Sequence, residues 1–161
     1  MTGEKRALIL LEDDVSRIAA ALGPYQETTK TRANLLMDPE GHALAQTGDP
    51  RIPPETLAAL VAASCAATKP VATVLQEGEL LTLTHTGKTA SIQLTAVSEG
   101  VVLATVFDAA TTVGVVVFYL KPLVTQLAAL VKEISERKQG VDLGAGFDGA
   151  ASDALDDVLG G

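Results

Sequence analysis

The chain has 161 residues, of which 47% are apolar and 20% charged, and its formal net charge is −8. This length and apolar content fit one domain with a core, and the lack of a Lys/Arg stripe that could neutralise phosphates excludes nucleic-acid binding. Cys65 is the only cysteine, which excludes an intrachain disulfide and a cysteine-based zinc site.

The start of the chain predicts neither a secretory signal nor a membrane anchor. Glu12, Asp13 and Asp14 follow a short apolar run, where a signal peptide needs a longer apolar stretch. No eighteen apolar residues follow one another without a polar or charged interruption. We therefore expect a soluble, cytoplasmic protein without membrane insertion.

The first predicted elements are a one-sided helix and a β-hairpin. Residues 12–28 place apolar side chains at helical spacing, and the acidic residues at their start suit a helix dipole. Residues 33–37 and 42–46 then flank Asp38-Pro39-Glu40-Gly41, a typical tight-turn sequence.

The stretch LAALVAASCAATKPVATVL, Leu57 to Leu75, predicts a helix without a hydrophilic side. One side is expected to pack on a sheet: Leu57, Leu60, Val61, Ser64, Thr68, Val71 and Leu75. The opposite side holds small uncharged residues: Ala59, Ala62, Ala63, Ala66, Pro70 and Thr73. Small side chains let another backbone approach closely, so we expect another protein surface to cover this stripe. The alternative is that alanine is simply a good helix former and needs no partner.

Pro70 and Pro122 complicate two helices. Pro70 is expected to kink the Leu57–Leu75 helix near Ala66, or to end a first segment at Lys69. In the stretch 112–138, Val113 to Leu120 has strand propensity, whereas the leucines that follow have helical spacing. By propensity alone this stretch is a strand followed by a helix.

Three strands are predicted between these helices, because residues 81–86 and 91–96 alternate and Val101–Phe107 is apolar on both faces. Beyond them, Gly140 to Gly149 is typical of a flexible linker. The last 22 residues carry five Asp and no Lys or Arg. We predict a domain at 1–139 and an acidic tail at 140–161. A short tail helix with Phe147, Ala151, Leu155, Val158 and Leu159 on one side would fold on a partner, and a merely solubilising end is the alternative.

The order helix, hairpin, apolar helix, three strands, helix resembles the Roadblock/LC7 family. LLMDPEGHALAQTGD is similar to its first hairpin, LAALVAASCAAT to its small-residue second helix, and VVLATVFDAATTVGVV to its last strand and the start of the last helix. The resemblance implies an α+β fold of the profilin-like α/β/α sandwich type. Its five-stranded antiparallel sheet has one helix on one face and two on the other. It also favours helix over strand for residues 112–120.

Within the family, the sequence is most similar to bacterial members that bind a Ras-like small GTPase, two protomers to one GTPase, in cell polarity or motility. The resemblance implies a homodimer with its second helices side by side, which accelerates GTP hydrolysis without donating an arginine finger. It also implies a cytoplasmic protein that concentrates at a cell pole. The implied contact residues are Ala59, Ala63, Ala66, Ala67, Pro70 and Thr73, with Phe147, Leu155, Val158 and Leu159 in the tail.

Departures at Lys69, Pro70 and Gly114-Val115-Val116-Val117, where family members often have small or basic residues, keep other functions open. One is a Roadblock scaffold in a polarity or motility complex that leaves GTP turnover unchanged, and another is a small-molecule sensor. We expect no catalytic residues, cofactor or metal. The chain has no GxxxxGK[ST] loop, Ser64 lies outside a GxSxG motif, and His42 and His85 fall on different predicted strands.

Overall fold

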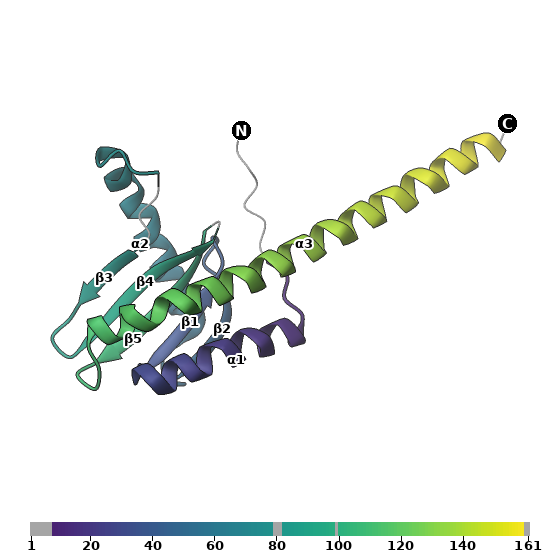
Figure 1. Ribbon diagram of the computed structural model, residues 1–161. Helices are drawn as coiled ribbons and strands as arrows, with labels where there is room; N and C mark the ends of the chain where they lie inside the picture. Colours follow the sequence, from purple (N-terminus) through teal and green to yellow (C-terminus); the bar gives the residue numbers. More distant parts are fainter. Residues whose placement is uncertain (1–7, 79–81, 99, 160–161) are drawn as a thin grey trace.

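The computed structural model describes residues 8–78, 82–98 and 100–159, with side chains up to Arg137. Its elements are α1 (Glu12–Thr29), β1 (Ala33–Met37), β2 (Ala43–Gly48), α2 (Pro54–Val74), β3 (Thr82–Thr86), β4 (Ala90–Ser98), β5 (Val101–Asp108) and α3 (Val113–Leu159). The five strands form one antiparallel sheet in the order β2-β1-β5-β4-β3 (Figure 1). The predicted hairpin and three-stranded segment are therefore confirmed.

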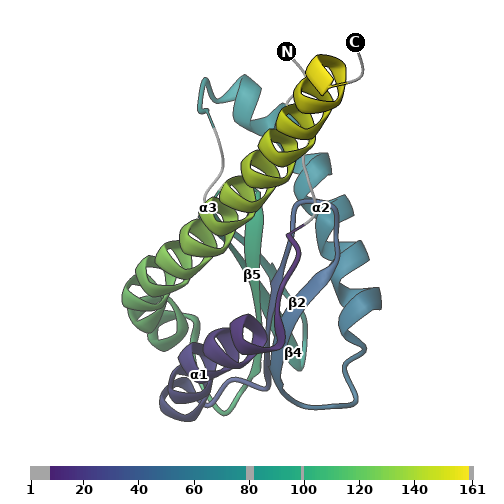
Figure 2. The ribbon, with the colours of Figure 1, turned by 90° about the vertical axis from the view of Figure 1, so that its right-hand side faces the viewer.

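The sheet lies between two helical layers, with α1 and α3 on one face and α2 on the other (Figure 2). Successive side chains of a strand point to opposite faces, so the central strands must be apolar on both sides. In β1, Leu36 packs with the α1/α3 cluster and Leu35 with the α2 cluster, and all five β1 residues are buried. This arrangement confirms the expected α/β/α sandwich.

The stretch with conflicting propensities is a helix. Val116, Leu120, Leu123 and Leu127 fall on one side of α3 and are all buried against the sheet and α1. In a strand Phe118 would share the face of Val116 and Leu120, yet Phe118 is 74% exposed, so the packing of the helix outweighs the β propensity of the valines. Pro122 lies inside the helix on its exposed side.

α3 continues without a break through residues 140–149 to Leu159, where the glycine content suggested a flexible linker. Figure 1 shows this end of the helix projecting past the sheet. No proline falls in this stretch to remove a helical hydrogen bond or to clash with the preceding turn, so the helix of residues 113–137 can extend into it. A separate tail at 140–161 remains a prediction.

Among the residues whose side chains the structure describes, two ion pairs join α1 to α3. Arg17 donates from both terminal nitrogens to Glu133 at 2.8 and 2.9 Å. The buried Asp14 accepts from Arg137 at 2.5 and 3.2 Å and also from the backbone N–H of Leu11 at 2.9 Å. One carboxylate therefore both caps the start of α1 and holds α3 against it.

In the described part of the chain, two helical stretches have the length and composition of membrane-spanning helices, namely Pro54–Val74 in α2 and Val113–Arg137 in α3. Each also packs on the sheet by one side, as core helices of globular domains do. The structure therefore leaves two helices with apolar surface on the side that faces away from the sheet.

Candidate functional site

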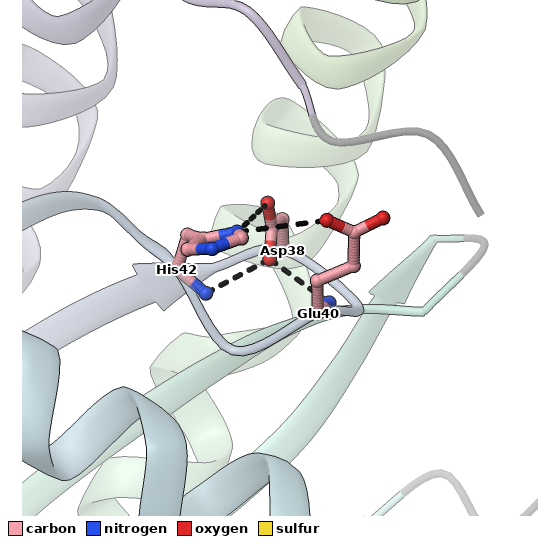
Figure 3. Close-up of side chains that lie close together, drawn as sticks. All are labelled: Asp38, Glu40 and His42. Carbon is pink, nitrogen blue, oxygen red and sulfur yellow. Dashed lines mark hydrogen bonds and ion pairs between the residues drawn. The ribbon is translucent and has the colours of Figure 1, made fainter.

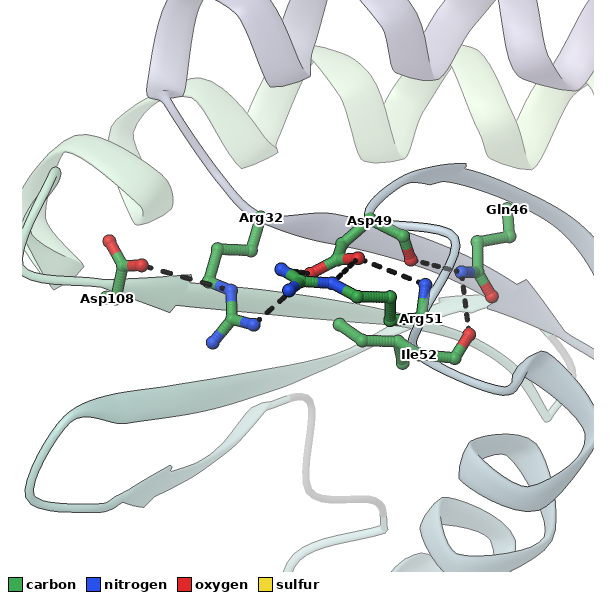
Figure 4. A network of polar contacts seen from close by, with 6 residues as sticks. All are labelled: Arg32, Gln46, Asp49, Arg51, Ile52 and Asp108. Atoms are coloured by element: carbon green, nitrogen blue, oxygen red, sulfur yellow. Dashed lines mark hydrogen bonds and ion pairs between the residues drawn. The ribbon is translucent and has the colours of Figure 1, made fainter.

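The loop that leads into α2 is fixed by Asp49 (Figure 4). Its carboxylate accepts from the backbone N–H of Arg51 at 3.0 Å and from the Arg51 guanidinium at 2.9 and 2.8 Å. Arg32 adds a bond at 3.3 Å and lies 3.9 Å from Asp108 at the end of β5. The bonds from Arg51 hold the pKa of Asp49 well below its ordinary value. The start of α2 is thereby tied to the sheet.

α2 begins at Pro54, a favoured residue for the first helical position because its missing N–H would have no helical partner there. Ala58, Val61 and Ala72 are buried towards the sheet, with Cys65 partly buried beside them. Gly41 in the β1–β2 turn explains why α2 carries alanines on this side. Gly41 has φ +90°, and a Cβ atom at this position would lie 3.0 Å from the Cβ atom of Ala62. The turn and the helix can pack closely only because both contribute small groups.

The side of α2 that faces away from the sheet is apolar and exposed to solvent in the single chain. Leu60 is 63% exposed, Val71 48% and Val74 80%. We call the following residues, all exposed and on one helical face, the α2 outer surface: Ala59, Leu60, Ala63, Ala67, Pro70, Val71 and Val74. Between Thr56 and Gln76 the only charged residue is Lys69, which lies to one flank. Contiguous exposed apolar surface of this kind is typical of a protein interaction site.

The sequence placed part of this surface on the wrong side. Leu60, Val71 and Leu75 were expected to pack on the sheet, yet all three are exposed. The close approach of Gly41 turns the side with Ala58 and Ala62 towards the sheet, and this rotation brings Leu60 and Val71 outward. The outer surface is therefore more hydrophobic than the alanine pattern suggests.

Of the six expected contact residues, the structure brings Ala59, Ala63, Ala67 and Pro70 together on the outer surface. Ala66 and Thr73 are exposed too, but they lie on the flank that borders a cavity of about 560 Å³ between α2 and the sheet. The tail residues Phe147, Leu155, Val158 and Leu159 belong to the part of α3 whose side chains are not described.

Pro70 lies inside a single helix, so α2 does not end at Lys69. Figure 2 shows the last turns of α2 directed away from the axis of its first turns, as a proline kink would produce. The outer surface therefore follows a bent helix.

A second exposed apolar surface lies at the start of α3, and sequence reasoning missed it. Its residues are Val113, Val115, Val117, Phe118 and Tyr119, with Phe118 74% exposed and in edge-to-face contact with Tyr119 at a centroid distance of 5.1 Å. The signal was present as the run Val113 to Leu120, which is apolar in every direction around a helix.

The two histidines lie at opposite edges of the sheet. His85 is on β3 at one edge of the sheet, and His42 immediately precedes β2 at the other edge. His42 stands in the turn itself rather than on the strand where the sequence placed it.

Comparison with known proteins agrees with this geometry. The family model described as the Roadblock/LC7 domain matches residues 18–107, more than half of the chain. A search of the curated proteins found no match to the chain.

Several solved structures are similar to the chain. The gliding protein MglB from Thermus thermophilus is 29% identical, with a TM-score of 0.72 over 78% of this chain and 96% of that one. MglB from Myxococcus xanthus is 26% identical, with a TM-score of 0.72 over 79% and 96%. An MglB with a tetrameric arrangement is 29% identical, with a TM-score of 0.74 over 79% and 96%.

Proposed function

The chain belongs to the Roadblock/LC7 domain family, whose members are generally regulatory or adaptor proteins, and on this premise we propose a specific role for it. It is a non-enzymatic homodimeric regulator of a Ras-like small GTPase of the MglA type, acting in cell polarity or gliding motility. The observation that carries the proposal is the uncharged, exposed α2 outer surface.

The proposed homodimer places the α2 helices of two protomers side by side. Ala59, Ala63 and Ala67 recur every four residues along one face, and such small side chains let two helix backbones approach closely. Leu60 and Val71 flank this row and would lose their contact with water in the pair. The strand β3, which pairs with β4 at one edge of the sheet, is mostly exposed as well.

The proposed GTPase would cover the part of the α2 outer surface that the partner helix leaves open. Support comes from the likeness to the MglB structures together with the family resemblance, which implies that a GTPase binds this face and that its GTP hydrolysis is accelerated by rearrangement of its own residues around the nucleotide. We place the protein in the cytoplasm, concentrated at a cell pole. The proposed contact with the GTPase needs no cofactor of this chain.

The proposed domain division assigns residues 1–139 to the Roadblock domain and residues 140–161 to a partner-binding tail. In this tail Phe147, Leu155, Val158 and Leu159 would contact the GTPase away from α2. The tail carries five Asp and no basic residue, so its contact on the partner should be basic.

GTP hydrolysis by the cognate MglA-type GTPase tests the activator role directly. Single-turnover hydrolysis is measured with and without this protein, and we expect a faster rate that saturates at two protomers per GTPase. A stable complex with an unchanged rate would instead establish the scaffold role. Complex formation by a protein that lacks residues 140–161 then separates contacts of the tail from contacts of α2.

Ala63→Arg tests the surface. A long charged side chain in the middle of a close helix contact must be desolvated, and we expect binding of the GTPase to weaken at least about tenfold. The matched control is Ala20→Arg, which changes an exposed alanine of α1 in the other helical layer. Equal affinities of the two variants would place the contact elsewhere.

The cavity of about 560 Å³ beside α2 favours one further candidate, a small-molecule sensor, because its volume is within the range of ligand pockets. It is lined mainly by Ala, Thr, Val and Leu residues. Mass spectrometry of the purified protein under native conditions would reveal a bound ligand, and a ligand-free mass would reject this role.

A further inference from the structure

The turn between β1 and β2 brings together three side chains of types that bind metal ions. The turn brings the side chains of Asp38, Glu40 and His42 close to one another (Figure 3). Nδ1 of His42 lies 3.1 Å from Oδ2 of Asp38 and 3.7 Å from Oε2 of Glu40. All three donor atoms lie within 4.8 Å of one another.

The Asp38 carboxylate is held rigidly. Its Oδ1 accepts from the backbone N–H groups of Glu40 and His42, both at 2.9 Å, and the residue is only 2% exposed. Hydrogen bonds to one carboxylate oxygen orient the other, as outer-shell partners do in metal sites. Oδ2 is thereby fixed towards the His42 ring, before any ion binds.

The charge of the turn favours a cation. Within the described ranges, His42 is the only basic partner paired with the buried Asp38 carboxylate, and Glu40 and Glu55 add negative charge nearby. A buried charge is stable in a protein when it is paired or when it coordinates a metal.

We propose that this turn binds a divalent transition-metal ion of the zinc type through His42 Nδ1, Asp38 Oδ2 and Glu40 Oε2. Two ligand atoms that each lie about 2.0–2.2 Å from such an ion, at a tetrahedral angle, are roughly 3.3–3.6 Å apart. This separation falls between the distances from His42 Nδ1 to Asp38 Oδ2, 3.1 Å, and to Glu40 Oε2, 3.7 Å. One imidazole and two carboxylates suit zinc better than calcium or magnesium, which prefer all-oxygen sites. Glu40 is partly exposed and free to adjust.

The ion would stiffen the support of α2. Gly41 lies between two of the ligands and packs against Ala58, Ala59 and Ala62. An ion that joins residues 38, 40 and 42 therefore fixes the part of the turn that touches the helix. This proposal does not depend on the GTPase role. Sequence patterns give no sign of the site, because its spacing matches no metal motif and only the turn geometry gathers the three donors.

Calorimetric titration of the untagged protein with Zn²⁺ tests the proposal, with Mg²⁺ as the comparison ion. We expect one Zn²⁺ per chain and weaker binding at pH 6 than at pH 8, because the ion displaces the His42 proton. His42→Gln and Asp38→Asn should each weaken Zn²⁺ binding at least about tenfold. The Asp38→Asn variant would keep a side-chain oxygen for the two turn amides, so the hairpin should still fold.

His85→Gln is the matched control, since His85 is the only other histidine. It should leave the affinity unchanged, and ¹⁵N NMR should show a shift of His42 Nδ1 when Zn²⁺ is added. Absence of saturable Zn²⁺ binding would overturn the proposal. So would binding that survives His42→Gln but is lost in His85→Gln or Cys65→Ser.

Discussion

Asp14 links the first and last helices through a single carboxylate. It accepts from Arg137 and from the backbone of Leu11, and the bond from Arg137 is the main cause of its lowered pKa. A carboxylate with a lowered folded pKa stabilises the protein above its unfolded pKa of about 3.9, and this contribution is lost as the pH falls through the folded value.

We therefore predict that Asp14→Asn lowers the free energy of unfolding at pH 7, and that the difference from wild type shrinks as the pH falls below about 4. Urea denaturation across this pH range measures it. The control is Asp13→Asn, which makes the same charge change at an exposed neighbour. A difference from wild type that does not change with pH would mean that the ion pair contributes nothing to folding.

At the scale of the element, each helix contains an internal proline on an exposed position: Pro24 in α1, Pro70 in α2 and Pro122 in α3. A proline inside a helix lacks the N–H that would bond to the carbonyl four residues earlier, and its ring crowds that carbonyl. In α3 this carbonyl belongs to Phe118, the most exposed residue of the second apolar surface.

Pro122→Ala should stabilise the protein by about 1–3 kcal/mol, because it restores the hydrogen bond to Phe118 in a helix that is already formed. The free energy of unfolding from chemical denaturation gives the value. Pro54→Ala serves as the control, because proline is tolerated at the first helical position and no gain is expected there. Destabilisation by Pro122→Ala would show that the fold requires the local distortion.

At the scale of the whole molecule, two apolar surfaces lie on opposite layers, one on α2 and one at the start of α3. If α2 forms the homodimer, sedimentation should give about twice the 16.6 kDa chain mass, and the Tm should rise with protein concentration. Leu60→Lys should produce the monomer, because the dimer would have to bury an unpaired charge.

Phe118→Lys distinguishes the two surfaces in the same sedimentation experiment. It places the same charge on the most exposed residue of the α3 surface, and the dimer should persist. A monomer from Phe118→Lys together with a dimer from Leu60→Lys would assign the interface to α3 instead.

The sequence by itself determined the order of the elements and the family. Alternation identified β4, helical spacing identified α1, and the turn sequence after Met37 located the first hairpin, since each pattern reflects local geometry. The lack of charge between Thr56 and Lys69 also predicted a helix without a hydrophilic side, and the exposed side of α2 is apolar. These features survive because they depend on neighbours within a few residues.

Only the tertiary structure decided which side of α2 faces outward, because the approach of Gly41 to Ala62 sets the rotation of the helix. Burial likewise decided that Val113 to Leu120 is a helix, since Val116 and Leu120 reach the core whereas Phe118, which a strand would place on the same face, is exposed. Two segments with the same local pattern can therefore have different structures when they meet different distant residues. The physical reason is that packing energy depends on three-dimensional neighbours, and a single segment does not contain them.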